Sequence, residues 1–213
     1  MYNMDIMDIE EKVREIYQEF VKRPSDINEH LETLYEYSKR CETIAECGVR
    51  SMVSTWAFLR GLLDNGKDRK QLLSVDIADV PNVGNVIEFV KSKIDMKFIK
   101  HDSATVELPE VDLLFIDTWH IYGHLKRELA FHNRRVKQYI IMHDTEIDGT
   151  IGESIRCNFN IREQSQTSGY SIYDIIVGLQ PAIKEFLCAH PEWVLEREYK
   201  NNNGLTILRR ISD

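Results

Sequence analysis

The chain has 213 residues, 43% of them hydrophobic and 29% charged, which is typical of one globular domain and excludes a disordered or fibrous chain. Its formal net charge of -8 argues against a general nucleic-acid binder, which normally presents a basic surface. The one locally basic stretch, residues 124–137, is typical of a solvated helix face.

The cysteines and the N-terminal sequence indicate the cellular compartment in which the protein is expected. Cys41, Cys47, Cys157 and Cys188 are scattered and form no CxxC pair, which favours reduced, mostly packed thiols over a disulfide framework or a zinc site. The N-terminus lacks an apolar signal core, and no apolar run approaches membrane-spanning length. We therefore expect a cytoplasmic protein without membrane or nucleic-acid partners.

Two helical patterns open the chain, over residues 8–22 and 25–41, and we expect the first 40 residues to form an N-terminal helical region. Ser25 or Asp26 is expected to cap the second helix. Short apolar runs then alternate with helical patterns. Strands are expected at 43–49, 72–78, 96–102, 111–118 and 138–145, and helices at 52–65, 83–94 and 124–136. Such alternation predicts a parallel sheet with helices on both faces.

The C-terminal part follows a different pattern. The polar segment 146–171 is too long for an ordinary connection and is a candidate lid or substrate loop. A helix at 179–190 precedes two strands, 192–200 and 205–211, whose connecting NNNG sequence suits a tight hairpin turn. We predict an α/β domain spanning residues 1–213, with a mostly parallel seven-stranded sheet that ends in an antiparallel hairpin.

Each of the five parallel strands is expected to end at an acidic residue. These residues are Glu46, Asp76, Asp102, Asp117 and Asp144. Ligands of open α/β sheets bind beyond the carboxyl ends of the strands. The acids therefore predict a carboxylate-lined crevice that can hold hydroxyl groups, an amine or a metal ion.

The turn after the first strand distinguishes among nucleotide ligands. A dinucleotide site would offer a G-x-G-x-x-G sequence, whereas this turn has only Gly48, and Glu46 would repel phosphate. Asp76 is placed to accept hydrogen bonds from both hydroxyls of a ribose. The turn therefore favours a nucleoside cofactor without a pyrophosphate and disfavours an NAD-dependent enzyme.

The segment 44–211 resembles the class I S-adenosylmethionine-dependent methyltransferases. Glu46, Gly48 and Ser54 match the family's first motif, E-x-G-x-x-x-G-x-S, in which Met52 stands where a second glycine is usual. The sequence LLSVDIA resembles the second motif. The resemblance implies a Rossmann-like fold with S-adenosylmethionine as cofactor. The implied cofactor-binding residues are Glu46, Gly48, Ser54, Asp76 and Ile77, with Asp102 and Ser103 near the adenine.

Methyl transfer to an aliphatic hydroxyl needs a base, a metal ion or both. Asp117-x-x-His120 and His143-Asp144 supply such groups after adjacent strands. Oxygen ligands with open positions suit Mg²⁺ or another hard divalent cation.

The pattern of Asp117-x-x-His120 and His143-Asp144 resembles the metal-dependent sugar and natural-product O-methyltransferases, grouped with rhamnosyl O-methyltransferases and cephalosporin-hydroxylase-like proteins. The resemblance implies that Asp117 and Asp144 hold Mg²⁺ and that His120 is the catalytic base beside Asp117. His143 replaces the first acid of the usual pair and is the third candidate metal ligand.

Other roles for these residues stay open. Asp117 can cap the following helix, and His120 or His143 can be structural. A zinc pair of His120 and His124 lacks a partner pair. Aromatic stacking on a sugar competes with simple packing for Trp119 and Tyr122. Further candidate ligands follow in the next loop: Glu146, Asp148 and Glu153.

We expect an S-adenosylmethionine-dependent O-methyltransferase that acts on a hydroxyl of a sugar or glycan, such as a rhamnose unit. The alternatives are a catechol-like or small secondary-metabolite acceptor, and a cofactor-binding module without catalysis. Membership in a larger glycan-building enzyme and assembly into a homo-oligomer also stay open.

Overall fold

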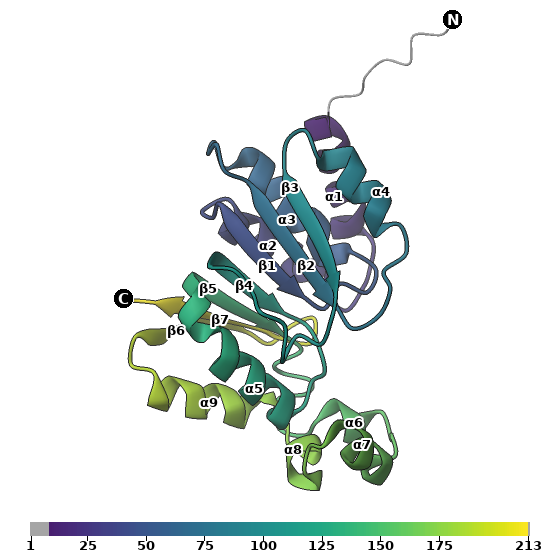
Figure 1. The fold of residues 1–213 in the computed structure, drawn as a ribbon, viewed down its shortest axis with the longest axis vertical. Coiled ribbons are helices and arrows are strands. Elements are labelled where there is room, and N and C mark those ends of the chain that lie inside the picture. Colours follow the sequence, from purple (N-terminus) through teal and green to yellow (C-terminus); the bar gives the residue numbers. More distant parts are fainter. Residues whose placement is uncertain (1–8, 213) are drawn as a thin grey trace, which may run out of the picture.

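The computed structural model describes residues 9–212 and contains a seven-stranded sheet in the order β3-β2-β1-β4-β5-β7-β6 (Figure 1). The strands are β1 (Thr43–Cys47), β2 (Gln71–Asp76), β3 (Asp95–Lys100), β4 (Val111–Ile116), β5 (Val136–His143), β6 (Trp193–Tyr199) and β7 (Leu205–Arg210). Neighbours among the first five strands pair in parallel, and β7 runs antiparallel to both β5 and β6. This arrangement confirms the predicted Rossmann-like methyltransferase fold.

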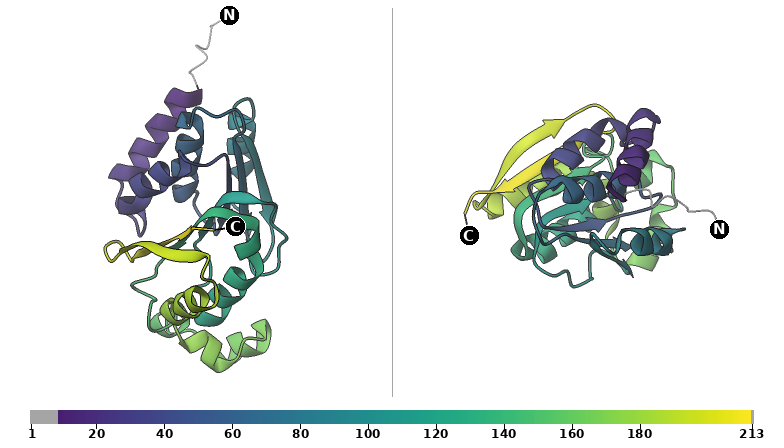
Figure 2. Two further views of the ribbon diagram at one scale, coloured as in Figure 1. Left: turned by 90° about the vertical axis from the view of Figure 1, so that its left-hand side faces the viewer. Right: turned by 90° about the horizontal axis from the view of Figure 1, so that it is seen from above.

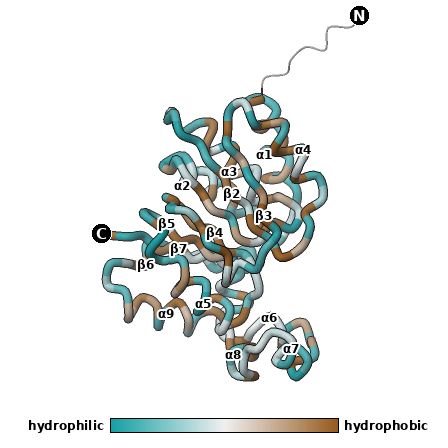
Figure 3. The backbone as a smooth tube through the Cα atoms, viewed as in Figure 1, coloured by the Kyte–Doolittle hydropathy of each residue, from teal (hydrophilic) through white to brown (hydrophobic). Residues whose placement is uncertain are grey.

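Helices cover both faces of the sheet (Figure 2). One face packs against α1 (Ile9–Lys22), α2 (Leu31–Ser38), α3 (Val53–Asp64) and α4 (Val83–Val90), and the other against α5 (Tyr122–His132) and α9 (Leu179–Ala189). Every residue of β1 is buried because parallel strands between two helical layers meet solvent on neither face. Hydrophobic stretches run through the sheet, whereas the surrounding loops are largely hydrophilic (Figure 3).

The second helix differs from its prediction. The backbone N–H of Ser25 donates to the side chain of Asn28 (3.0 Å), and a short 3-10 helix, Asn28–His30, precedes α2. The chain turns over residues 25–28 and does not begin a long helix there, so the predicted cap at Ser25 or Asp26 is wrong. Asp8, the expected first residue of the first helix, lies outside the described residues.

The segment 146–171 contains two short helices, α6 (Glu153–Arg156) and α7 (Ile161–Ser168), and is followed by α8 (Ile172–Ile176); none of the three was predicted from the sequence. Asn160 caps α7, and Ser171 with Asp174 forms a capping box on α8. Tyr170 and Ile175 pack on Ile121 in a small apolar cluster of their own. We call residues 146–177 the lid segment.

Among the described residues, no helix is both long and apolar enough to cross a membrane.

Candidate active site

The turn from β1 into α3 lies directly against the end of β4. Gly48 has a φ of +90°, and a Cβ at this position would overlap the carbonyl oxygen of Asp117. Only glycine allows this close approach. Met52, which replaces the usual second glycine, adopts the left-handed conformation itself, with a φ of 60°. The left-handed backbone that favours glycine is therefore adopted here by a methionine.

A cavity of about 840 Å³ opens beside this turn at the carboxyl ends of β1 to β4. Its lining includes Gly48, Asp76, Ile77, Asp102 and Ser103. These are five of the seven residues assigned to the cofactor from the sequence. Cavities of this size bind small molecules of cofactor size. We call this space the large cavity.

Asp76 organises the turn as well as lining the large cavity. Its Oδ2 accepts hydrogen bonds from the backbone N–H groups of Val49 (2.9 Å) and Arg50 (3.0 Å), and its Oδ1 accepts one from Ala78 (2.9 Å). A carboxylate offers about four lone-pair positions, so one position is left for a ligand hydroxyl.

Glu46 lies beneath the crevice and not at its rim. Its carboxyl is fully buried and accepts hydrogen bonds from Ser54 (2.6 Å), Thr55 (2.9 Å) and Ser74 (2.9 Å). Burial raises the pKa of Glu46 to about 7, although these hydroxyls oppose the shift. Glu46 lines neither cavity of the site, unlike the other four strand-end acids, and it holds the start of α3 onto the sheet.

A smaller cavity of about 190 Å³ adjoins the large one. The two share Gly48, Arg50, Asp117 and Thr118 in their linings. The residues that line the smaller cavity and not the large one include Asp26 from the N-terminal turn, Ser54, His120, Asp144 and Glu153. Asp117 therefore stands where the two spaces meet.

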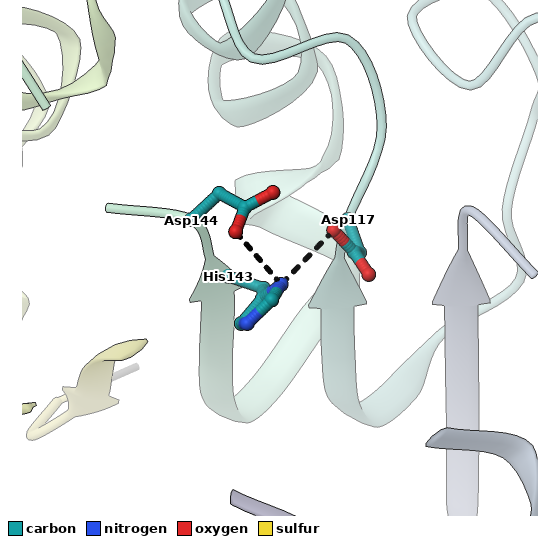
Figure 4. Close-up of side chains that lie close together, drawn as sticks. All are labelled: Asp117, His143 and Asp144. Atoms are coloured by element: carbon teal, nitrogen blue, oxygen red, sulfur yellow. Dashed lines mark hydrogen bonds and ion pairs between the residues drawn. The ribbon is translucent and has the colours of Figure 1, made fainter. Parts of the chain in front are cut away.

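Asp117, His143 and Asp144 form a compact group at the ends of β4 and β5 (Figure 4). Nδ1 of His143 lies 3.3 Å from Oδ1 of Asp117 and 3.4 Å from Oδ1 of Asp144. On the other side of the ring, Nε2 lies 3.1 Å from the carbonyl oxygen of Asp26 and 3.3 Å from that of Asn202. Carbonyl oxygens only accept, so Nε2 carries a hydrogen. Nδ1 faces the two carboxylates: it donates to them when the ring is protonated and offers its lone pair to a cation when the ring is neutral.

This arrangement fits a divalent cation. The Oδ1 atom of Asp144 is buried and has no hydrogen-bond partner in the described part of the chain. One atom from each of Asp117, His143 and Asp144 lies within 4.8 Å of the others. A lone pair and two carboxylates that face one another repel unless a proton or a cation lies between them. Imidazole and carboxylate ligands are both common for divalent metals.

His120 lies among four carboxylates. Its Nε2 is 3.1 Å from Asp117, and its Nδ1 is 3.1 Å from Asp144, 3.5 Å from Asp148 and 3.6 Å from Glu153. Burial lowers the pKa of His120, but the hydrogen bond and charge of Asp117, with the other acids, outweigh it and raise the pKa to about 9. Hydrogen bonds from His120 and His143 in turn hold the pKa of Asp117 below its usual range, against the effect of burial.

The other candidate residues lie apart from the group around Asp117 and His120. His124 bonds to Ser103 (3.1 Å) and Tyr170 (3.1 Å) in the wall of the large cavity, so it forms no zinc pair with His120. Trp119 also lines the large cavity. Tyr122 instead pairs with Glu185 (2.8 Å), and Glu146 lines neither cavity.

Three contributions to the site were not predicted from the sequence. Asp26 comes from the N-terminal turn and forms an ion pair with Arg50 (2.8 Å). The lid segment adds Tyr170 to the wall of the large cavity, and the NNNG turn adds the carbonyl oxygen of Asn202. The unusual length of the lid segment was the sequence signal that it could contribute to the site, but no sequence pattern links Asp26 or Asn202 to His143.

No protein-family model matches this sequence, and no curated protein matches it. Solved structures do resemble the fold. A Burkholderia thailandensis 1,6-didemethyltoxoflavin-N1-methyltransferase has a TM-score of 0.58 at 10% identity, covering 99% of this chain and 94% of that one. An SAH-bound Podospora anserina methyltransferase has a TM-score of 0.54 at 14% identity, covering 97% and 89%.

A third similar structure is the N-terminal domain of EvdMO1, solved in the presence of SAH and D-fucose. Its TM-score is 0.52 at 14% identity, and the match covers 99% of this chain and 100% of that domain. At these identities the likeness establishes the shared fold. What the chain binds and does must be argued from its own site.

Proposed function

We propose that the chain is an S-adenosylmethionine-dependent O-methyltransferase that acts on a hydroxyl of a sugar or glycan. The observation that carries this proposal is the meeting of two cavities at Asp117, beside a group of histidine and aspartate side chains. One cavity suits a nucleoside cofactor and the other an acceptor. A methyl group then passes between them where their linings meet, because methyl transfer depends chiefly on in-line positioning.

The cofactor would occupy the large cavity. Asp76 would accept a hydrogen bond from the ribose, and Ile77, Asp102 and Ser103 would surround the adenine. Gly48 leaves room for close approach of the backbone. Ser54 and the buried Glu46 would support the methionine end from below. The SAH-bound structures that share this fold support the choice of cofactor.

Asp117, Asp144 and His143 would hold Mg²⁺ or another divalent cation. The unpartnered Oδ1 of Asp144 and the position of Nδ1 of His143 between two carboxylates support this assignment. Such an ion, when bound, polarises an acceptor hydroxyl and makes it more acidic.

His120 is the group in this site that would take the hydroxyl proton. It lines the smaller cavity beside Asp117 and Asp144. The surrounding carboxylates keep the imidazole protonated at neutral pH in the metal-free protein. Neutralising Asp117 and Asp144 would lower the pKa of His120 and free it to accept a proton. The proposed base and the proposed cation are therefore coupled.

The polar lining of the smaller cavity supports a sugar over a catechol-like acceptor. Asp26, Ser51 and Glu153 supply hydrogen-bond partners for a polyol. The EvdMO1 domain, which shares this fold, was solved in the presence of D-fucose, and this sugar is consistent with the proposed acceptor class.

Two measurements test the proposal in sequence. Calorimetry with S-adenosylmethionine should show binding, and a panel of deoxy sugars and glycosides should then yield a methylated product by mass spectrometry. Removal of divalent ions with EDTA should abolish turnover, and added Mg²⁺ should restore it. Absence of cofactor binding would contradict the whole proposal. Binding without any product would instead favour a non-catalytic module.

A further inference from the structure

The NNNG turn between β6 and β7 reaches the proposed metal site from the far end of the sequence. Asn202 and Asn203 have positive φ angles of 44° and 69°, which explains the choice of asparagine in this turn. The backbone oxygen of Asn203 accepts from Glu146 (3.0 Å) at the start of the lid segment. The turn is therefore packed between the sheet, the lid segment and the N-terminal turn.

The side chain of Asn202 joins this turn to the N-terminal segment on both sides of Asp26. Its Nδ2 donates to the carbonyl oxygen of Ser25 (2.8 Å), and its Oδ1 accepts from the backbone N–H of Glu29 (3.0 Å). Both hydrogen-bonding groups of the amide are used. They connect segments that lie more than 170 residues apart in the sequence.

The two connected segments supply the two acceptors of His143. One is the carbonyl oxygen of Asp26, and the other is the carbonyl oxygen of Asn202 itself. Together they fix the hydrogen on Nε2 and direct Nδ1 toward Asp117 and Asp144. Partners of this kind orient a histidine ligand and select its tautomer.

We infer that Asn202 is a positioning residue for a divalent cation: its side chain holds together the two backbone carbonyls that present His143 to the metal. This inference rests on the proposed function, because it takes Asp117, His143 and Asp144 as the cation ligands. It assigns the NNNG turn a role beyond closing a hairpin.

The test measures Mn²⁺ affinity of the full chain by the EPR signal of the free ion. Asn202→Gly keeps the positive φ and removes the amide, so the turn can survive while the connection is lost. We expect Mn²⁺ affinity to fall about 10- to 100-fold, the scale for lost partners of a ligating histidine. The affinity for SAH, measured by calorimetry, should stay unchanged.

The matched control is Asn201→Gly. It removes the neighbouring amide, whose hydrogen bond within the described residues goes to the side chain of Glu29 (2.6 Å), and should leave Mn²⁺ affinity near that of the wild type. A second variant, Asn202→Asp, keeps the acceptor for Glu29 and loses only the donor to Ser25. Its added negative charge favours cations, so any loss of Mn²⁺ affinity in this variant must come from lost positioning.

The outcomes are distinguishable. If the wild type binds no Mn²⁺, both the proposed metal site and this inference fail. If the wild type binds Mn²⁺ and Asn202→Gly binds it equally well, only the inference is overturned. An equal loss of affinity in Asn201→Gly and Asn202→Gly would also overturn it, because a general loosening of the turn would then be the cause.

Discussion

At the scale of single residues, neighbouring groups shift the pKa values of the buried carboxyls in and beneath the site. Glu46 and Asp117 both end buried strands, yet burial raises the pKa of Glu46, whereas two histidines lower that of Asp117. The difference follows from their partners. Hydroxyls surround Glu46, and imidazoles face Asp117.

Gly48→Ala should destabilise the protein and abolish cofactor binding. The new methyl group would overlap the carbonyl oxygen of Asp117 at a positive φ, which costs about 2 to 4 kcal/mol from overpacking and backbone strain. Urea unfolding measures this change. The control is Gly84→Ala in α4, where no heavy atom would lie within 4 Å of the new Cβ. Equal stabilities of the two variants would contradict the role of Gly48.

Glu46→Gln should flatten the pH dependence of stability. The unfolded carboxyl ionises near pH 4.5 and the folded one near 7, so the folded state holds the extra proton between these values. Stability from this group is therefore full below pH 4.5 and falls as the pH rises to 7, by about 3 kcal/mol. Urea unfolding of wild type and variant between pH 4.5 and 8 measures the difference. Parallel curves would show that Glu46 does not titrate in this range.

His120→Ala should lower kcat by at least ~10²-fold, the usual scale for a lost general base. S-adenosylmethionine affinity should not change, because His120 does not line the large cavity. Steady-state kinetics and calorimetry measure the two quantities. His190→Ala, at the C-terminal end of α9, is the control. Near-normal turnover of His120→Ala would remove this residue from the mechanism.

At the scale of elements, the lid segment is the part that depends most on tertiary contacts. Its backbone is hydrogen-bonded to the loop after β4: the N–H of Glu153 in the lid segment donates to the carbonyl oxygen of His120 in that loop (2.9 Å). Within the segment, Arg156 forms two hydrogen bonds to the fully buried Asp148 (2.6 and 2.8 Å). The lid segment therefore contributes a carboxylate, Asp148, beside His120 and a lining residue, Tyr170, to the large cavity.

Arg156→Gln should open the lid segment locally. It leaves the carboxylate of Asp148 buried without its nearest cation and, among the described residues, with only His120 at 3.5 Å, which costs about 3 kcal/mol. Amide hydrogen exchange should become faster in residues 146–177 and stay unchanged in the sheet. The matched control is Arg162→Gln at an exposed position of α7. Unchanged exchange in Arg156→Gln would show that the pair does not hold the segment.

At the scale of the whole molecule, the sheet brings the ends of five strands to one edge, and segments from both ends of the chain close around it. A ligand bound there contacts elements that are distant in sequence. Binding should therefore stabilise the entire fold and not only one loop.

SAH at about 100 times its Kd should stabilise the folded protein by about 2.7 kcal/mol and raise Tm by about 5 to 10 °C for a domain of this size. Differential scanning calorimetry with and without SAH measures the shift. NAD at the same concentration is the comparison ligand, since the first turn lacks the glycines that a pyrophosphate needs. A larger shift with NAD would contradict the choice of cofactor.

The sequence alone determined the seven strands, the helices between the first five of them, the parallel sheet and the crevice at its carboxyl edge. These properties follow from local periodicity and from turn residues such as Gly48, which act over a few positions. It also predicted that Asp117, His120 and Asp144 would lie together, because residues that follow parallel strands must gather at one edge. The structure brings these three together as expected.

Only the tertiary structure decided the rest. Glu46 lies in the core and not at the rim, because α3 packs over it and supplies two of its three hydrogen-bonding hydroxyls. The predicted helix cap at Ser25 or Asp26 gave way to a turn that bonds to Asn202. His143 owes its orientation to carbonyl oxygens from the two ends of the chain. Contacts between residues so distant in sequence leave no periodic pattern in it, because they depend on how the helices, strands and turns pack against one another.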